Sequence, residues 1–141
     1  MEDEEQVAEM SPQECWQRLS THELGRLAFR VVDEVHILPV NYAVRNESLL
    51  FRTAEGTKLL GVVMESSVAL EIDGYDETSA WSVVVRGQAR RLEEDEAHAA
   101  DDLDSLPWVQ PETPKYNAVR IDPTVVSGRH FRRRSRPDPA A

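Results

Sequence analysis

The sequence lacks the features of a disulfide-rich, exported or membrane-spanning protein. Only one of its 141 residues, Cys15, is a cysteine, so no internal disulfide can form. No apolar run approaches the ~18 residues that a transmembrane helix needs. The N-terminus, Met1-Glu2-Asp3-Glu4-Glu5, is acidic where a secretory signal would be basic and then apolar. We therefore expect a cytoplasmic protein.

Motifs for hydrolysis or metal binding are also missing. The sequence contains no nucleophile elbow, no G-x-G-x-x-G and no phosphate-binding loop of the G-x-x-x-x-G-K-[ST] type. The four histidines are scattered without metal-ligand spacing: His22, His36, His98 and His130. We therefore predict no metal site, and we see no apparatus for hydrolytic catalysis.

Positive charge is scarce except at the C-terminal end. The net charge of −10 argues against a general nucleic-acid-binding protein. Residues 129–136 carry five arginines and no acid, and this segment could contact a nucleic acid or an acidic partner. Such an end is more often a disordered tail. The interpretation is an acidic disordered N-terminus over residues 1–10, one domain over 11–131, and a basic disordered tail over 132–141.

The pattern of apolar residues predicts a mainly β protein with a few short helices. Ser11, Pro12 and Glu14 form a helix start of the capping-box type, and the helix would run to about Leu19. Two more helices are expected over 58–65 and 93–106. Alternating residues predict six strands: Leu24–Val32, Val35–Val44, 49–51, Ser67–Asp73, Trp81–Leu92 with a bulge or bend at Gly87, and Asn117–Ile121 followed by a short extended piece over 124–127. Their hairpin order favours an antiparallel barrel or half-open barrel.

The segment from Phe51 to Lys58 joins an expected strand to an expected helix. Thr53, Gly56, Thr57 and Lys58 lie at this junction. Unpaired N–H groups at a helix N-terminus favour an anion, and a lysine in the first turn is electrostatically misplaced unless an anion accompanies it. The segment therefore suggests a bound phosphate, although an ordinary threonine cap is the commoner explanation for such a turn.

Polar and aromatic residues accompany this segment elsewhere in the chain. Asn41 and Tyr42 end one expected strand, Trp81 and Ser82 begin another, and Trp108 lies in a proline-broken stretch. A cofactor with a flat ring and a phosphate would use such groups. Taken one at a time, each is better explained as an ordinary core residue.

Together these residues resemble a family. The motifs in question are Pro39-Val40-Asn41-Tyr42, Phe51-Arg52-Thr53-x-x-Gly56-Thr57-Lys58, Trp81-Ser82-Val83-Val84-Val85-Arg86-Gly87 and Val119-Arg120-Ile121-x-Pro123. They are similar, in order and spacing, to the pyridoxamine 5′-phosphate oxidase-like, flavin-binding split-barrel family, in particular its short actinobacterial-type members. The resemblance covers about Cys15 to Phe131. It implies a six-stranded antiparallel split β-barrel, usually a homodimer with flavin mononucleotide (FMN) at the subunit interface.

The resemblance also implies roles for individual residues. Thr53, Thr57 and Lys58 would hold the flavin phosphate. The ring system would lie beside Val40, Asn41 and Tyr42 of one subunit and approach Trp81 and Ser82, expected from the other subunit, with Trp108 on the substrate side. Longer oxidases of the family carry arginine and lysine where this chain has Thr57 and Lys58. They also end in a tryptophan- and arginine-containing substrate segment that this chain lacks, so pyridoxal phosphate synthesis is not expected.

Three functions are compatible with these observations. The first is a flavin-dependent oxidoreductase acting on a small molecule of unknown identity. The second is a non-catalytic protein that binds flavin, deazaflavin or haem. The third is a small barrel that binds nucleic acid through its arginine tail. We rank the third last, because the body of the protein is acidic and has few strand aromatics.

Overall fold

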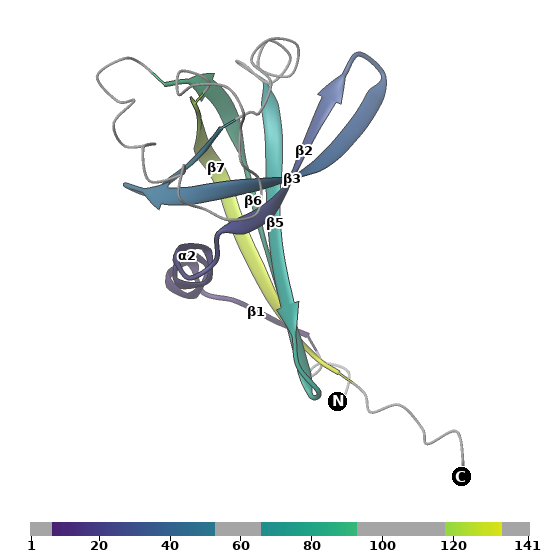
Figure 1. The fold of residues 1–141 in the computed structure, drawn as a ribbon. Coiled ribbons are helices and arrows are strands. Elements are labelled where there is room, and N and C mark those ends of the chain that lie inside the picture. The colour runs from purple at the N-terminus through teal and green to yellow at the C-terminus, as the bar shows by residue number, and fades with distance from the viewer. Residues whose placement is uncertain (1–6, 53–65, 93–117, 134–141) are drawn as a thin grey trace.

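The structure of the chain, a computed structural model, describes residues 7–52, 66–92 and 118–133. These residues form one helix and seven strands (Figure 1): β1 (Val7–Glu9), α2 (Pro12–Ser20), β2 (Leu24–Val31), β3 (Glu34–Arg45), β4 (Ser48–Arg52), β5 (Ser67–Tyr75), β6 (Ser79–Arg91) and β7 (Ala118–Arg132). The expected helices over 58–65 and 93–106 lie outside the described residues. No described helix has the length and hydrophobicity to span a bilayer.

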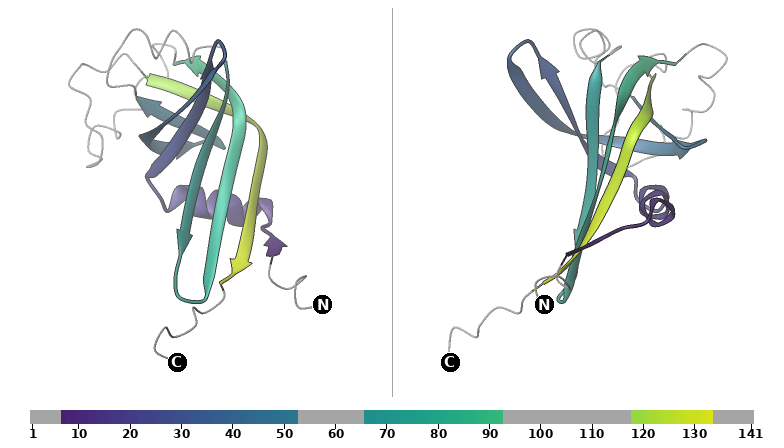
Figure 2. Two further views of the ribbon diagram at one scale, coloured as in Figure 1. Left: turned by 90° about the vertical axis from the view of Figure 1, so that its right-hand side faces the viewer. Right: turned by 180° about the vertical axis from the view of Figure 1, so that it is seen from behind.

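The strands form a closed antiparallel barrel. Their order is β1-β7-β4-β3-β2-β5-β6, and a further pairing between β6 and β7 closes six of the strands into a ring. β6 and β7 pair from Ser79↔Arg132 to Arg91↔Val119. With β5 they extend beyond the barrel to the end where β1 is added (Figures 1 and 2). The predicted mainly β, six-stranded split-barrel fold is confirmed.

Alternation along the strands separates a packed interior from an outer face. In β5 and β6 every second residue is buried, as expected for strands with one face on a core. The inward side chains from all six barrel strands meet in one cluster, whose largest fully buried members include Tyr42, Phe51, Leu27, Leu49, Leu70, Ile72 and Ile121. The residues between them in sequence form the outer face, which the sites described below occupy.

The predicted helix start is confirmed. Ser11 caps α2, its hydroxyl accepting a hydrogen bond from the Glu14 backbone N–H at 3.2 Å, and Pro12 occupies the first helical position. Cys15 and Leu19 are buried on the side of the helix that packs on the sheet. Capping therefore fixes where α2 begins, and burial of one apolar face fixes how it lies.

Gly87 forms the predicted bulge. The pairing between β6 and β7 shifts register between Arg86 and Gly87, so that Gly87 lies opposite Pro123. The backbones approach so closely here that a Cβ at Gly87 would lie 2.2 Å from the Asp122 carbonyl oxygen. Only glycine fits this approach, which is the usual reason for a glycine inside a strand.

Two segments are more ordered than the sequence suggests. The first is part of the N-terminus expected to be disordered: Val7–Glu9 pair with β7, and the Met10 N–H donates to the Gly128 carbonyl at 2.8 Å. An open edge of β7 supplies these hydrogen bonds, which no local pattern reveals.

The second segment is β7 itself, which was expected as a strand ending at Ile121 plus a short extended piece. It continues through Pro123 to Arg132. Proline is tolerated because it sits at the bulge, where the ladder of backbone hydrogen bonds is already interrupted.

Candidate functional site

The segment Val40–Tyr42 in β3 presents its residues to both sides of the sheet. Val40 and Tyr42 belong to the core, at 4% and 1% exposed, and Asn41 lies between them with the opposite orientation. The Tyr42 hydroxyl donates to the Leu19 carbonyl of α2 at 2.7 Å. Burial raises the pKa of this phenol, so Tyr42 stays a neutral donor. Tyr42 thus joins the helix to the barrel, and Asn41, although only 6% exposed, points to the side of the sheet opposite the core.

Replacing Tyr42 by phenylalanine is expected to destabilise the fold by about 1–2 kcal/mol, because it leaves the buried Leu19 carbonyl without this donor. Urea denaturation followed by circular dichroism measures the change. Tyr75→Phe is the matched control, since Tyr75 is 76% exposed and should lose almost nothing. Equal stabilities for Tyr42→Phe and the parent protein would contradict the role given to this hydrogen bond.

Trp81 lies inside the molecule. Its side chain is 9% exposed and part of the core cluster. The His22 ring meets it edge-on at 5.0 Å between centroids, and the Arg18 guanidinium carbon lies 4.5 Å from the ring centroid. On the neighbouring strand Gly74 leaves room for the indole: a Cβ there would come within 2.8 Å of Nε1. Trp81 is therefore enclosed by its own chain.

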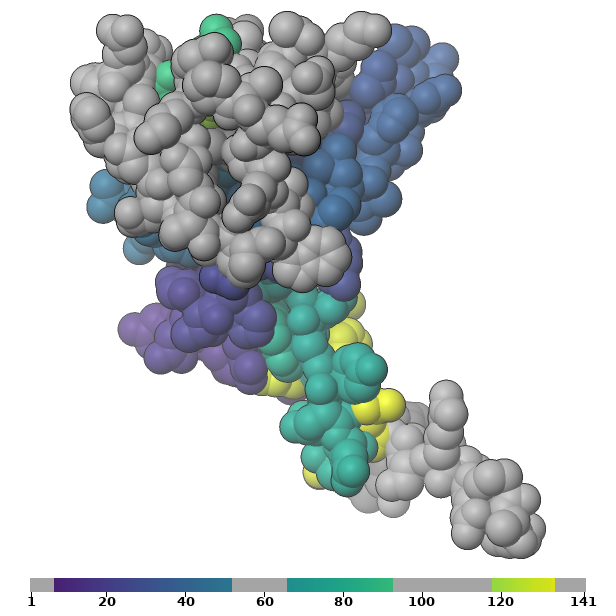
Figure 3. All heavy atoms as spheres, in the orientation of Figure 1, coloured from purple at the N-terminus to yellow at the C-terminus, as the bar shows by residue number. Residues whose placement is uncertain are grey.

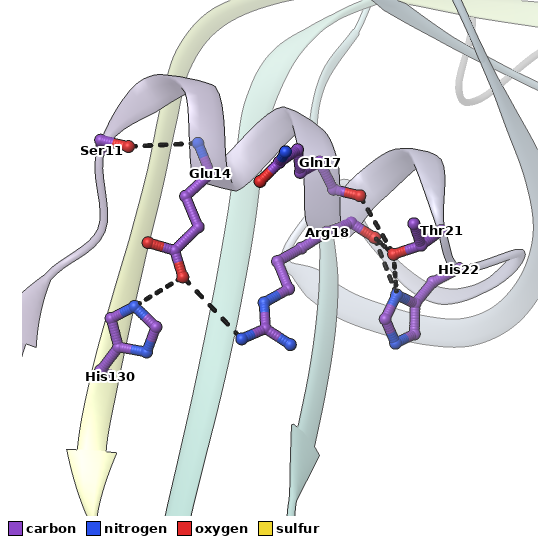
Figure 4. Close-up of polar contacts among 7 residues, drawn as sticks. All are labelled: Ser11, Glu14, Gln17, Arg18, Thr21, His22 and His130. Carbon is purple, nitrogen blue, oxygen red and sulfur yellow. Dashed lines mark hydrogen bonds and ion pairs between the residues drawn. The ribbon is translucent and has the colours of Figure 1, made fainter.

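Polar contacts between α2 and β7 hold this arrangement in place (Figure 4). The Glu14 carboxylate lies 2.8 Å from His130 Nε2 and 3.8 Å from Arg18 Nη2. At the other end of the helix His22 Nδ1 lies 2.8 Å from the Arg18 carbonyl oxygen. Because His130 is the register partner of Trp81, the helix is tied down next to the indole that it covers.

Ser82 faces the opposite way from Trp81, as adjacent residues of a strand must. It is half-buried on the outer face, with Asp73 of β5 and Arg129 of β7 as its register partners. Of the two residues expected to approach a cofactor from β6, Ser82 is thus the one on the outer face. Asn41 and Ser82 share this face.

A charged cluster lies between them that the sequence did not reveal. The Arg26 guanidinium on β2 contacts Glu71 at 3.0 Å and Asp73 at 3.2 Å, both on β5. Burial and then the neighbouring Asp73 carboxyl raise the pKa of Glu71 to about 7, against the opposing effect of Arg26. Glu71 is therefore protonated more readily than an ordinary glutamate. The strand pattern does place Arg26 on the outer face, but the pairing with Glu71 depends on the register of β2 and β5.

The last described strand before the expected phosphate segment lies beside the expected ring segment. β4 ends at Arg52, and its residue Phe51 is the register partner of Tyr42 in β3. The described end of β4 therefore lies alongside Val40–Tyr42. Four of the expected site residues lie outside the described residues: Thr53, Thr57, Lys58 and Trp108. Among the described residues no group of three histidine, cysteine or acidic side chains could hold a metal ion.

Comparison with known proteins identifies the fold family. Residues 11–130 match the family described as Pyridoxamine 5'-phosphate oxidase. The chain belongs to this family. The match covers α2 and the barrel strands except the last two residues of β7, so the family resemblance inferred from the motifs is confirmed.

Proteins of Mycobacterium and Corynebacterium are among those similar to this chain. The solved structure of the FAD binding protein from Mycobacterium smegmatis is 39% identical, with a TM-score of 0.76 over 89% of this chain and 98% of that one. A putative pyridoxamine 5'-phosphate oxidase from Corynebacterium glutamicum is 41% identical, with a TM-score of 0.77 over 89% and 93%. An uncharacterized protein of Mycobacterium tuberculosis is 40% identical over 67% of this chain and 86% of its own.

Proposed function

We propose that this protein is a flavin-dependent oxidoreductase that binds FMN and acts on a small molecule. One observation supports the proposal: β4 ends at Arg52, directly before the segment that contains Thr53, Thr57 and Lys58 in the sequence, and its Phe51 pairs with Tyr42 of β3. A phosphate site and a ring site for one ligand must be neighbours, and a β4 that ends beside Val40–Tyr42 is compatible with this requirement. Membership of the family and the similarity to a protein named as FAD-binding support a flavin.

The available side chains suit a flavin. Asn41, which is 6% exposed, and half-buried Ser82 carry an amide and a hydroxyl on the side of the sheet opposite the core, and these groups can pair with the polar edge of a flavin ring. Thr53, Thr57 and Lys58 would bind the phosphate, and Trp108 would cover the substrate side. A bound flavin supplies the hydride chemistry, and the protein supplies orientation and exclusion of water.

We also propose that two copies of the chain assemble with the flavin between them. Asn41 in β3 and Ser82 in β6 are three strand spacings apart in one chain, about 14 Å at the usual spacing, and the Arg26–Glu71–Asp73 cluster lies between them. A second copy placed on the outer face would bring its Ser82 close to the first copy's Asn41. The site would then be complete only in the dimer.

The visible spectrum of the purified protein tests the cofactor. We expect the absorbance of oxidised flavin, or saturable binding of added FMN, and bleaching by NADH or NADPH if the protein turns over. FAD is the specific alternative, because the M. smegmatis relative is named for it. Titration with FMN and FAD side by side decides between them. A haem spectrum, or a colourless protein that ignores flavins and deazaflavin, would contradict the proposal.

Lys58→Ala is expected to weaken FMN binding about 10- to 100-fold and riboflavin binding hardly at all. A charge-assisted hydrogen bond is worth about 1.5–3 kcal/mol, and only FMN carries the phosphate that would receive it. Fluorescence titration of the flavin measures both affinities. Lys115→Ala is the control, since it removes the only other lysine of the chain. Equal losses for FMN and riboflavin would refute the phosphate role of Lys58.

A further inference from the structure

The ribbon of β5, β6 and β7 that extends beyond the barrel has a groove on its outer face. The groove has a volume of about 520 Å³, within the usual range of small-molecule sites. In the space-filling view this end of β5 and β7 stands clear of the barrel (Figure 3). The outer-face residues that line the groove are Asp73, Tyr75, Ala80, Ser82, Phe131 and Arg133.

Two aromatic side chains stand on either side of a small residue in this groove. Ala80 of β6 is the register partner of both Tyr75 on β5 and Phe131 on β7. Neighbouring strands are about 4.8 Å apart, so the two aromatic residues are separated by about 10 Å across the alanine. Stacked rings have centroids about 4.5–7 Å apart, so this separation leaves room for one flat ring between the two. We call Tyr75, Ala80 and Phe131 the aromatic slot.

The slot is open to solvent. Tyr75 is 76% exposed, and Ala80 and Phe131 are half-buried. An exposed tyrosine is by itself ordinary on a protein surface. Here a second aromatic residue and the missing bulk at Ala80 make the surface concave, and a flat ligand gains contact with both rings.

Arg133 fixes a positive charge at the hairpin end of the slot. Its guanidinium carbon lies 4.6 Å from the Tyr75 ring centroid, and its backbone N–H donates to the Thr78 carbonyl at 2.7 Å. Its Nη1 also donates to the Asp76 carbonyl. A guanidinium has several N–H donors, so this bond leaves others for an anionic oxygen. The Asp76 carboxylate is turned to its own loop, where it accepts from the Thr78 and Ser79 N–H groups at 2.9 and 2.8 Å.

The opposite end of the slot is polar. Asp73, Ser82 and Arg129 are register neighbours on β5, β6 and β7, two residues along each strand from the slot. That step is about 7 Å, so the edge of a ring in the slot can reach this row. The Asp73 carboxylate lies 3.2 Å from Arg26 and can also accept from an amino group of a ligand. The slot thus has a carboxylate at one end and a guanidinium at the other.

These features fit a flat ring that carries an amino or imino donor on one edge and is joined to a phosphate on the other side. We propose that the aromatic slot binds the base of a purine nucleotide, with its polar edge toward Asp73 and its phosphate on Arg133. The net charge of −10 opposes a long polyanion, so the ligand is a single nucleotide unit rather than a nucleic acid. The site needs no bound flavin, so it goes beyond the proposed function.

Calorimetric titration of the full chain with ADP tests the inference. We expect saturable binding with a Kd below about 1 mM that saturating FMN leaves unchanged. Tyr75→Ala should weaken ADP about 10-fold because a base loses an aromatic stacking partner, whereas Tyr75→Phe should keep the affinity. Ala80→Leu should abolish binding, because it fills the slot while both aromatic rings remain.

The phosphate contact has a test of its own. Arg133→Ala should weaken ADP about 10- to 100-fold and adenosine hardly at all, since only ADP offers an anion to the guanidinium. Arg132→Ala is the matched control, because exposed Arg132 points to the opposite face of β7. Equal losses for ADP and adenosine would contradict the role given to Arg133.

The source of the nucleotide is decided by titrating NADPH and FAD beside ADP. Similar affinities for NADPH and ADP, both lost in Ala80→Leu, identify a site for a free nucleotide. If NADPH binds about 10-fold more tightly than ADP, or FAD more tightly than both ADP and FMN, the slot holds the nucleotide half of that dinucleotide.

Several outcomes would overturn the inference. These are a protein without saturable ADP binding, ADP binding that survives Ala80→Leu, and ADP that FMN displaces. A dimer that becomes monomeric in Tyr75→Ala would show that a second copy of the chain fills the slot instead. A protein that binds ADP but no flavin would overturn the proposed cofactor and leave this inference standing, and one that binds FMN but not ADP would do the reverse.

Discussion

Replacing Gly87 by alanine is expected to destabilise the protein by about 3 kcal/mol, among the largest effects of a single methyl group in this chain. The added Cβ would lie 2.2 Å from the Asp122 carbonyl oxygen and 2.9 Å from both the Asp122 carbonyl carbon and Pro123 Cα. All three are backbone atoms, so no side chain can rotate away. β6 and β7 would have to separate at the bulge where they close the barrel.

Gly128→Ala is the comparison that isolates this cause. A Cβ there would also be crowded, but its nearest neighbours are Cys15 Sγ at 2.8 Å and Met10 Sδ at 2.9 Å, both side-chain atoms. Met10 in particular can change rotamer, so the loss should be about 1 kcal/mol. Denaturant unfolding followed by circular dichroism measures both variants. Equal losses would show that the backbone contact at Gly87 is not what limits substitution there.

The sequence predicts the parts of the fold that local patterns determine. Ser11 and Glu14 mark the start of α2 because a cap and its partner are three residues apart. Gly87 marks a bulge because glycine is disfavoured inside an ordinary strand. β1 was not predicted, because the pairing of Val7–Glu9 depends on an edge of β7 that lies more than a hundred residues away in the chain.

The candidate site is predicted less completely, for a similar reason. The family resemblance selects Asn41 and Ser82 as site residues, and the structure places both on the outer face. The resemblance does not identify Arg26, Glu71 and Asp73, because the contacts of Arg26 with the two carboxylates join positions that are 45 or more residues apart in the sequence. The resemblance also assigns Trp81 and Ser82 the same role beside the cofactor, although strand alternation requires their side chains to face opposite sides of the sheet.

Trp81→Ala is expected to destabilise the protein by about 3–5 kcal/mol. The indole is 9% exposed, packs between His22 and Arg18 of the helical region, and fills the space that Gly74 leaves on β5. Alanine would leave a large cavity under α2, and the neighbouring backbone can close it only in part. Urea unfolding followed by circular dichroism gives the loss directly, without relying on the fluorescence of the residue removed.

Trp81→Phe then separates a packing role from a cofactor role. Phenylalanine retains an aromatic ring against His22 and Arg18. If Trp81 only packs in the core, the Trp81→Phe protein should therefore keep a flavin affinity within about threefold of the parent protein. Ser82→Ala should do the opposite, weakening flavin about tenfold with little loss of stability, because one outer-face hydrogen bond is worth about 1 kcal/mol or more. If Trp81→Phe instead lost flavin while Ser82→Ala did not, the indole would have to leave the core and contact the cofactor in the assembled protein.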